Sequence, residues 1–132
     1  MTMTSMPPAE PAGDAIDARV LARLRAECDC QGARLSDELL AVYAAELHPR
    51  LEAIRDAIGR RDLAALSYAA HALKGGSSLI GAQPLAQLCL QLERAAREGA
   101  IEDARALLPA LAREEDRLCQ ALGALTGRAM TR

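Results

Sequence analysis

Apolar residues recur at helical spacing along most of the chain. The longest such run follows Ser36 and comprises Leu40, Tyr43, Leu47, Leu51, Ile54 and Ile58. Spacings of three and four residues are typical of a helix that buries one face. Five segments of this kind cover about residues 14–26, 36–58, 62–81, 84–98 and 101–122. The connections between the last four are short, which makes successive helices antiparallel neighbours. We therefore expect an all-α fold, an up-down four-helix bundle with an additional N-terminal helix.

Polar residues, glycines and a proline predict where these helices begin, end or break. Ser36 is predicted to cap the second helix and Asp62 the third, because their side chains can accept hydrogen bonds from free N–H groups. Gly81 and Gly99 are predicted to end the third and fourth helices. Pro109 predicts an irregularity within the fifth segment.

The composition supports a helical core in a single domain. Hydrophobic residues make up 51% of the 132 residues, yet the chain has no Phe, no Trp and only two Tyr. Such a core must consist mainly of Leu, Ala, Ile and Val, and the first two are strong helix formers. We expect a flexible leader over residues 1–13, the bundle over 14–125 and a short tail over 126–132.

Charge and hydropathy argue against several classes of function. The formal net charge of −2 does not suit a nucleic-acid surface, which needs clustered Lys and Arg. No apolar run approaches the roughly 18–20 residues of a membrane span, and the N-terminus lacks the features of a secretory signal. We therefore expect a cytoplasmic protein that binds neither nucleic acid nor membrane.

The four cysteines predict neither a disulfide framework nor a metal site. Cys89 and Cys119 occupy apolar helical positions, where we expect reduced core thiols. Cys28 and Cys30 supply half of a metal site at most, because structural zinc takes four ligands and no second cysteine pair or nearby histidine completes the set.

His71 is predicted to stand on the solvent face of the third helix. At about 100° per residue, the large apolar residues Leu66, Leu73 and Ile80 fall on the opposite side. The residues that share its side are Ser67, Tyr68, Lys74, Gly75 and Ser78. A structural histidine would be expected near the apolar stripe, whereas an exposed one is either plain surface or reactive.

The neighbours of His71 favour the reactive interpretation. Gly75 lies one turn further on the same face, where a missing side chain opens the ring to a bulky partner. Lys74 is the only lysine of the chain, and its charge can stabilise an added phosphoryl group. Ser78 adds a hydroxyl donor one turn beyond Gly75. Because histidine titrates at about pH 6.5, a ring nitrogen is available as a nucleophile at neutral pH.

Two further residues receive no chemical role. Gly76 falls on the flank of the same helix, and we interpret it as a site of close approach to a neighbouring helix. His48 is followed by a proline and lacks the Lys-Gly company of His71, so we interpret it as a surface residue.

The string H-A-L-K-G-G-S-S-L-I-G-A, from His71 to Ala82, resembles the H-x-L-K-G-[small]-[small]-x-x-x-G signature of histidine-containing phosphotransfer (HPt) domains. The similarity extends over about residues 15–125 and includes L-x-x-L-C-x-x-L-E on the next helix. The resemblance implies that His71 is the phosphoacceptor, through Nε2. It implies charge-stabilising and access-giving roles for Lys74 and Gly75. Glu93 matches a carboxylate or amide that, in some relatives, bonds the imidazole Nδ1.

The resemblance also implies partners and a mechanism. An HPt protein is a phosphoryl carrier rather than an enzyme, and it relays the group between receiver-domain aspartates. The implied partners are response-regulator receiver domains and a hybrid sensor histidine kinase. We expect no cofactor on this chain, with Mg²⁺ on the partner receiver, and a monomer. The receiver would dock on exposed small and apolar residues around His71, from the second and third helices.

The main alternative is a docking or sequestering module that binds a receiver or another enzyme without phosphotransfer. A comparison of wild type with His71→Ala separates the two functions, because loss of signalling with intact binding supports transfer. An autonomous histidine kinase would need an ATP-binding domain, for which 132 residues leave no room. A purely structural bundle leaves Lys74, Gly75 and the exposed His71 unexplained.

Overall fold

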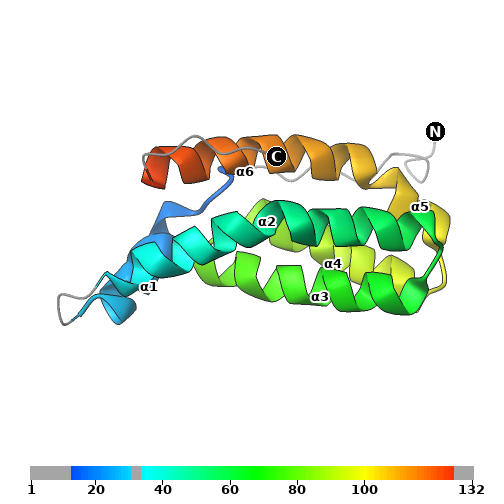
Figure 1. Cartoon of the computed structure of the whole chain (residues 1–132), viewed down its shortest axis with the longest axis horizontal. Coiled ribbons are helices and arrows are strands. Elements are labelled where there is room, and N and C mark those ends of the chain that lie inside the picture. The colour runs from blue at the N-terminus through cyan, green and yellow to red at the C-terminus, as the bar shows by residue number, and fades with distance from the viewer. Residues whose placement is uncertain (1–12, 31–33, 127–132) are drawn as a thin grey trace, which may run out of the picture.

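The computed structural model describes residues 13–30 and 34–126, and within these ranges it has six helices and no strand. The helices are α1 (Ala18–Cys28), α2 (Leu35–Gly59), α3 (Leu63–Ile80), α4 (Gln83–Arg97), α5 (Ile101–Ala106) and α6 (Leu108–Thr126). Figure 1 shows α2, α3, α4 and α6 running side by side in alternating directions, with α1 against one end. The all-α, up-down four-helix bundle with an additional N-terminal helix is thus confirmed.

Leucine and isoleucine build the core between these helices, as the composition predicts. The largest fully buried side chains are Leu40, Leu47, Leu51, Ile54, Ile58, Leu66, Leu73, Ile80, Leu85, Leu88, Leu92 and Leu111. Full burial of one such side chain contributes about 1.5–3 kcal/mol. These residues recur every three or four positions, so their burial fixes which face of each helix turns inward and which face is left for function.

The fifth predicted segment is two helices rather than one. The short helix α5 ends at Ala106, and α6 begins at Leu108. Pro109 is the second residue of α6, where its missing N–H has no intrahelical acceptor to lose. The irregularity expected near Pro109 is confirmed, and the expectation of a single helix over residues 101–122 is wrong.

The start of α2 also differs from the prediction. Ser36 lies inside the first turn, fully buried, and does not cap the helix. Its N–H donates to Asp29 Oδ1 at 3.0 Å and its hydroxyl to Asp29 Oδ2 at 2.6 Å. These hydrogen bonds hold the pKa of Asp29 below its usual range. The Asp29 carboxylate, directly after α1, therefore accepts a hydrogen bond from a backbone N–H in the first turn of α2.

Both ends of α3 are fixed as predicted. The Asp62 carboxylate accepts a hydrogen bond from the Ala65 N–H at 3.0 Å. At the other end Gly81 adopts φ +89°, in the left-handed region that favours glycine. Its carbonyl oxygen accepts a hydrogen bond from the Asp17 N–H at 2.7 Å, just before α1. The N-terminal helix thus anchors the end of the helix that carries His71.

Neither range of described residues contains a helix with the length and apolar character that crossing a membrane requires. The leader predicted over residues 1–13 and the tail predicted over 126–132 lie outside the described residues, except for Gly13 and Thr126.

Candidate functional site

His71 lies in the middle of α3 with its side chain pointing away from the core. The side chain is 72% exposed. Leu66, Leu73 and Ile80, on the opposite side of the helix, are each at most 1% exposed. The helical period therefore places His71 correctly, on an open face of the bundle.

Glu93, on the antiparallel neighbour α4, joins His71 and Lys74 into one cluster. Its Oε2 lies 2.9 Å from His71 Nδ1, and its Oε1 lies 2.5 Å from Lys74 Nζ. The Glu93 side chain is only 12% exposed, and that of Lys74 is 29% exposed. A single carboxylate thus holds two side chains of α3, one with each oxygen.

The charge on Glu93 determines which ring nitrogen of His71 is free. Burial acts to raise the pKa of Glu93, but hydrogen bonds from Lys74 and His71 outweigh it and bring the pKa below its usual range. An ionised carboxylate can only accept hydrogen bonds, so Nδ1 must donate to it and carries the proton. In the neutral imidazole this leaves Nε2 unprotonated, as a nucleophile.

Gly75 and Ser78 lie on the same face as His71 but at different distances along the helix. A Cβ added at Gly75 would meet no atom within 4 Å, so the space one turn beyond the imidazole is open. Ser78 is exposed and lies seven residues from His71, about 10 Å along the helix axis. The structure therefore brings His71, Lys74 and Glu93 together, with Gly75 beside them, and leaves Ser78 two turns away.

Gly76 faces α2, as its position on the helix flank predicts. An added Cβ would lie 3.5 Å from Tyr43 Cδ1, which is ordinary van der Waals contact. Alanine would therefore fit, and it is favoured over glycine in a helix by about 1 kcal/mol. Close approach to the neighbouring helix does not by itself require a glycine at this position.

His48 is more than the plain surface residue expected from its sequence context. Its Nδ1 lies 2.9 Å from Oε2 of Glu115, whose side chain is 1% exposed. Arg55 Nη2 approaches the other oxygen of Glu115 at 3.0 Å. His48 and Arg55 both belong to α2 and Glu115 to α6, so the cluster ties these two helices together. At the position one turn beyond His48 the chain has Glu52 rather than a glycine.

Cys89, predicted to be a reduced core thiol, lies on α4 one turn before Glu93. Cys89 is fully buried, and burial raises the pKa of its thiol to about 12, so it is an un-ionised core group at neutral pH. Across the described ranges, no three His, Cys, Asp or Glu side chains gather where they could hold a metal ion.

Two surface features lie near the site, one of them predicted from the sequence and the other not. Tyr68, three residues before His71, is 80% exposed. A groove runs between α2 and α3 and includes Ala72, the residue next to His71. The helical period predicts that Tyr68 shares the solvent face of His71, and this is confirmed, whereas the groove depends on how two helices pack.

The family model of the Hpt domain matches residues 38–124, more than half of the chain. The chain belongs to the Hpt domain family. The crystal structure of histidine-containing phosphotransfer protein B (HptB) from Pseudomonas aeruginosa PAO1 is similar to it, with a TM-score of 0.78 and 31% sequence identity. The match covers 88% of this chain and 97% of that one. No curated protein matches the chain.

Membership of the Hpt family establishes the general activity. Hpt proteins are phosphoryl carriers in phosphorelays, where they interact with receiver domains and kinases. This chain accordingly belongs to a family of histidine phosphotransfer proteins, which are phosphocarrier intermediates rather than classical enzymes.

Proposed function

We propose that this Hpt protein relays a phosphoryl group between receiver-domain aspartates through Nε2 of His71. One observation carries the proposal: His71 is exposed in mid-helix while its Nδ1–H is held by the Glu93 carboxylate at 2.9 Å. This pairing fixes the tautomer and the ring orientation, and it presents the unprotonated nitrogen to a partner, which is the role that a third group plays beside many nucleophiles.

The transfer step balances without a further co-reactant. Nε2 attacks the phosphorus of the receiver's aspartyl phosphate, a P–N bond forms, and the P–O bond to the aspartate breaks to release its carboxylate. The Nδ1 proton stays on the ring, so positive charge develops on the imidazole. The Glu93 carboxylate stabilises that charge. The reverse of this step passes the group to a second receiver.

The residues around His71 would assist by charge and by access. Lys74 has three N–H donors, so it can remain bound to Glu93 and still contact the phosphoryl oxygens. Gly75 leaves room for the receiver to approach the ring. Ser78 would contact the partner further along the helix and not the phosphoryl group, because it lies two turns from His71.

Phosphoryl transfer depends chiefly on positioning and charge neutralisation, and the receiver would provide most of both. We assign Mg²⁺ to the acidic pocket of the receiver and no cofactor to this chain. Its partners would be response-regulator receiver domains and a hybrid sensor histidine kinase, and it would act as a monomer in the cytoplasm.

The test is phosphotransfer from phosphorylated receivers to the full chain, carried out with every receiver domain of the source organism. Wild type should gain an acid-labile phosphoryl group from at least one receiver, and His71→Gln should gain none. Labelling of His71→Gln at the wild-type level would contradict the proposal.

The same assay separates transfer from docking alone. Because the His71 side chain is 72% exposed and lies outside the core, His71→Ala should still fold and bind the receiver while transfer is lost. If wild type binds a receiver tightly but never exchanges a phosphoryl group with any of them, the chain is a docking or sequestering module.

A further inference from the structure

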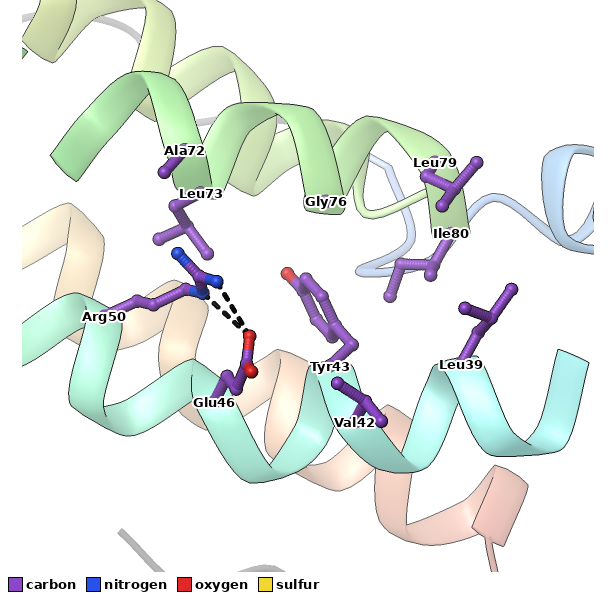
Figure 2. A pocket seen from close by; sticks show the side chains of 10 residues that line it. All are labelled: Leu39, Val42, Tyr43, Glu46, Arg50, Ala72, Leu73, Gly76, Leu79 and Ile80. Carbon is purple, nitrogen blue, oxygen red and sulfur yellow. Dashed lines mark hydrogen bonds and ion pairs between the residues drawn. The ribbon is translucent and has the colours of Figure 1, made fainter. Parts of the chain in front are cut away.

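A groove of about 150 Å³ lies between α2 and α3 (Figure 2), and Ala72, the residue after His71, is part of its lining. Its lining is mostly apolar and consists of Leu39, Val42, Tyr43, Glu46, Arg50, Ala72, Leu73, Gly76, Leu79 and Ile80. A cavity of roughly this volume accommodates a benzene-sized apolar group. The groove is therefore large enough for one apolar side chain of a partner.

Gly76 and Tyr43 form the middle of the groove, and both are held in place. Figure 2 shows Tyr43 pointing from α2 toward Gly76 on α3. The Tyr43 hydroxyl hydrogen-bonds the Ser77 hydroxyl at 2.7 Å, and both residues are buried. The ring is thus fixed from two ends, and the groove exists before any partner arrives. An alanine would fit at position 76 and is the better helix former, but its Cβ would lie 3.5 Å from Tyr43 Cδ1 and occupy space that the glycine leaves empty.

The polarity of the groove indicates the kind of group that it takes. Its two charged residues, Glu46 and Arg50, form an ion pair with each other at 2.8 Å and leave no net charge. Val42 and Leu79, on opposite walls, are 55% and 51% exposed. Such exposure of large apolar side chains on two facing helices favours an apolar partner surface.

The groove lies close to the phosphotransfer site along α3. Ala72 and Gly76, which line it, directly follow His71 and Gly75 along α3. Gly76 is five positions after His71, or about 7.5 Å along the helix axis. A partner that brings an aspartyl phosphate to His71 would therefore cover the groove as well.

We propose that the receiver domain which exchanges phosphoryl groups with His71 inserts one large apolar side chain into this groove, and that Gly76 keeps the groove open for it. This inference rests on the proposed function and specifies where on the chain the receiver binds. Both glycines then assist docking of the receiver. Gly75 leaves room beside the imidazole, and Gly76 leaves room for the inserted apolar side chain.

The experiment uses the full chain and the receiver that exchanges phosphoryl groups with it fastest. The variants are Gly76→Ala, which narrows the groove, and Val42→Glu, which places a charge on its wall. Ala41→Glu is the matched control, because Ala41 is exposed on α2 and does not line the groove. The dissociation constant, Kd, is measured by titration. Labelling of His71 by phosphoramidate reports on the nucleophile without a receiver.

We expect Kd to rise about fivefold or more for Gly76→Ala and about tenfold or more for Val42→Glu, given what one added methyl or charge costs in an apolar pocket. Ala41→Glu should keep the wild-type Kd within about twofold, and all three variants should be labelled by phosphoramidate like wild type. Wild-type Kd values for Gly76→Ala and Val42→Glu, or equal weakening by Ala41→Glu, would overturn this inference while leaving phosphotransfer intact. Labelled His71 that passes its group to no receiver would overturn the proposed function, and the inference with it.

Discussion

The two oxygens of Glu93 hold His71 Nδ1 at 2.9 Å and Lys74 Nζ at 2.5 Å. This geometry distinguishes His71 from an ordinary exposed histidine, whose ring would rotate and exchange tautomers freely. Because Glu93 is ionised, it favours the developing charge on the imidazole during phosphoryl transfer. The reactivity of His71 therefore depends on one carboxylate, that of Glu93 on the neighbouring helix α4.

Replacing Glu93 by glutamine should slow phosphorylation of His71 about tenfold, because a neutral amide forms a weaker hydrogen bond to Nδ1–H than a carboxylate does. The measurement is the rate of labelling by phosphoramidate, which needs no receiver. Glu98→Gln, at an exposed carboxylate directly after α4, is the control and should label at the wild-type rate. An unchanged rate for Glu93→Gln would show that Glu93 does not assist the nucleophile.

The helical period could predict the exposure of His71, because exposure depends only on residues of the same helix. It could not predict the contact with Glu93, since that contact depends on the register between α3 and α4. Glu93 could be named only through the family resemblance. The contact of His48 could not be predicted either, because its partner, Glu115, lies 67 positions later in the chain and on another helix.

At the scale of single elements, the C-terminal end of α3 is the most constrained junction near the site. Gly81 has φ +89°, and a Cβ at this position would lie 2.9 Å from the Asp17 carbonyl oxygen and 3.0 Å from Val20 Cβ. The end of α3 thus packs directly against the start of α1, with no space for a side chain.

Gly81→Ala should lower the free energy of unfolding by about 3 kcal/mol, from the left-handed backbone and the contacts with α1 together. Gly99→Ala is the control, because Gly99 has φ +69° but an added Cβ would meet nothing within 4 Å. It should cost only about 1 kcal/mol, from the backbone conformation. Urea denaturation of both variants checks this, and equal losses would mean that contact with α1 adds nothing.

The cluster of His48, Arg55 and Glu115 makes the α2–α6 contact dependent on pH. Burial acts to raise the pKa of Glu115, but hydrogen bonds from His48 and Arg55 outweigh it, so the pKa in the folded protein is lowered. The stabilising contribution of Glu115 is therefore complete above its unfolded pKa of about 4.3 and is lost as pH falls through the folded value.

Glu115→Gln should consequently be less stable than wild type by about 1–2 kcal/mol at pH 7, and the difference should shrink as the pH falls below about 4. Urea denaturation between pH 3 and pH 7 measures both curves. Glu52→Gln, which alters an exposed partner of Arg55, serves as the control and should follow wild type. A difference between Glu115→Gln and wild type that stays constant with pH would contradict this account.

At the scale of the whole molecule, the bundle topology places a nucleophile, its orienting carboxylate and an apolar groove on adjacent helices. The bundle itself was predictable, because apolar spacing and short connections determine an up-down arrangement. Pro109 indicates an irregularity within residues 101–122, but the division into two helices and the Asp29–Ser36 contact depend on which groups meet after packing. The groove was also not predictable from the sequence, because its walls come from two helices, α2 and α3, and depend on how these pack.

The most direct test of the central claim is to find where the phosphoryl group resides on the phosphorylated chain. The full chain is labelled by its receiver, and the modified atom is identified by mass spectrometry together with NMR of the imidazole rings. The account predicts one acid-labile phosphoryl group, on Nε2 of His71, because Glu93 occupies Nδ1. A phosphoryl group on Nδ1 of His71, or on another side chain such as His48, would contradict it.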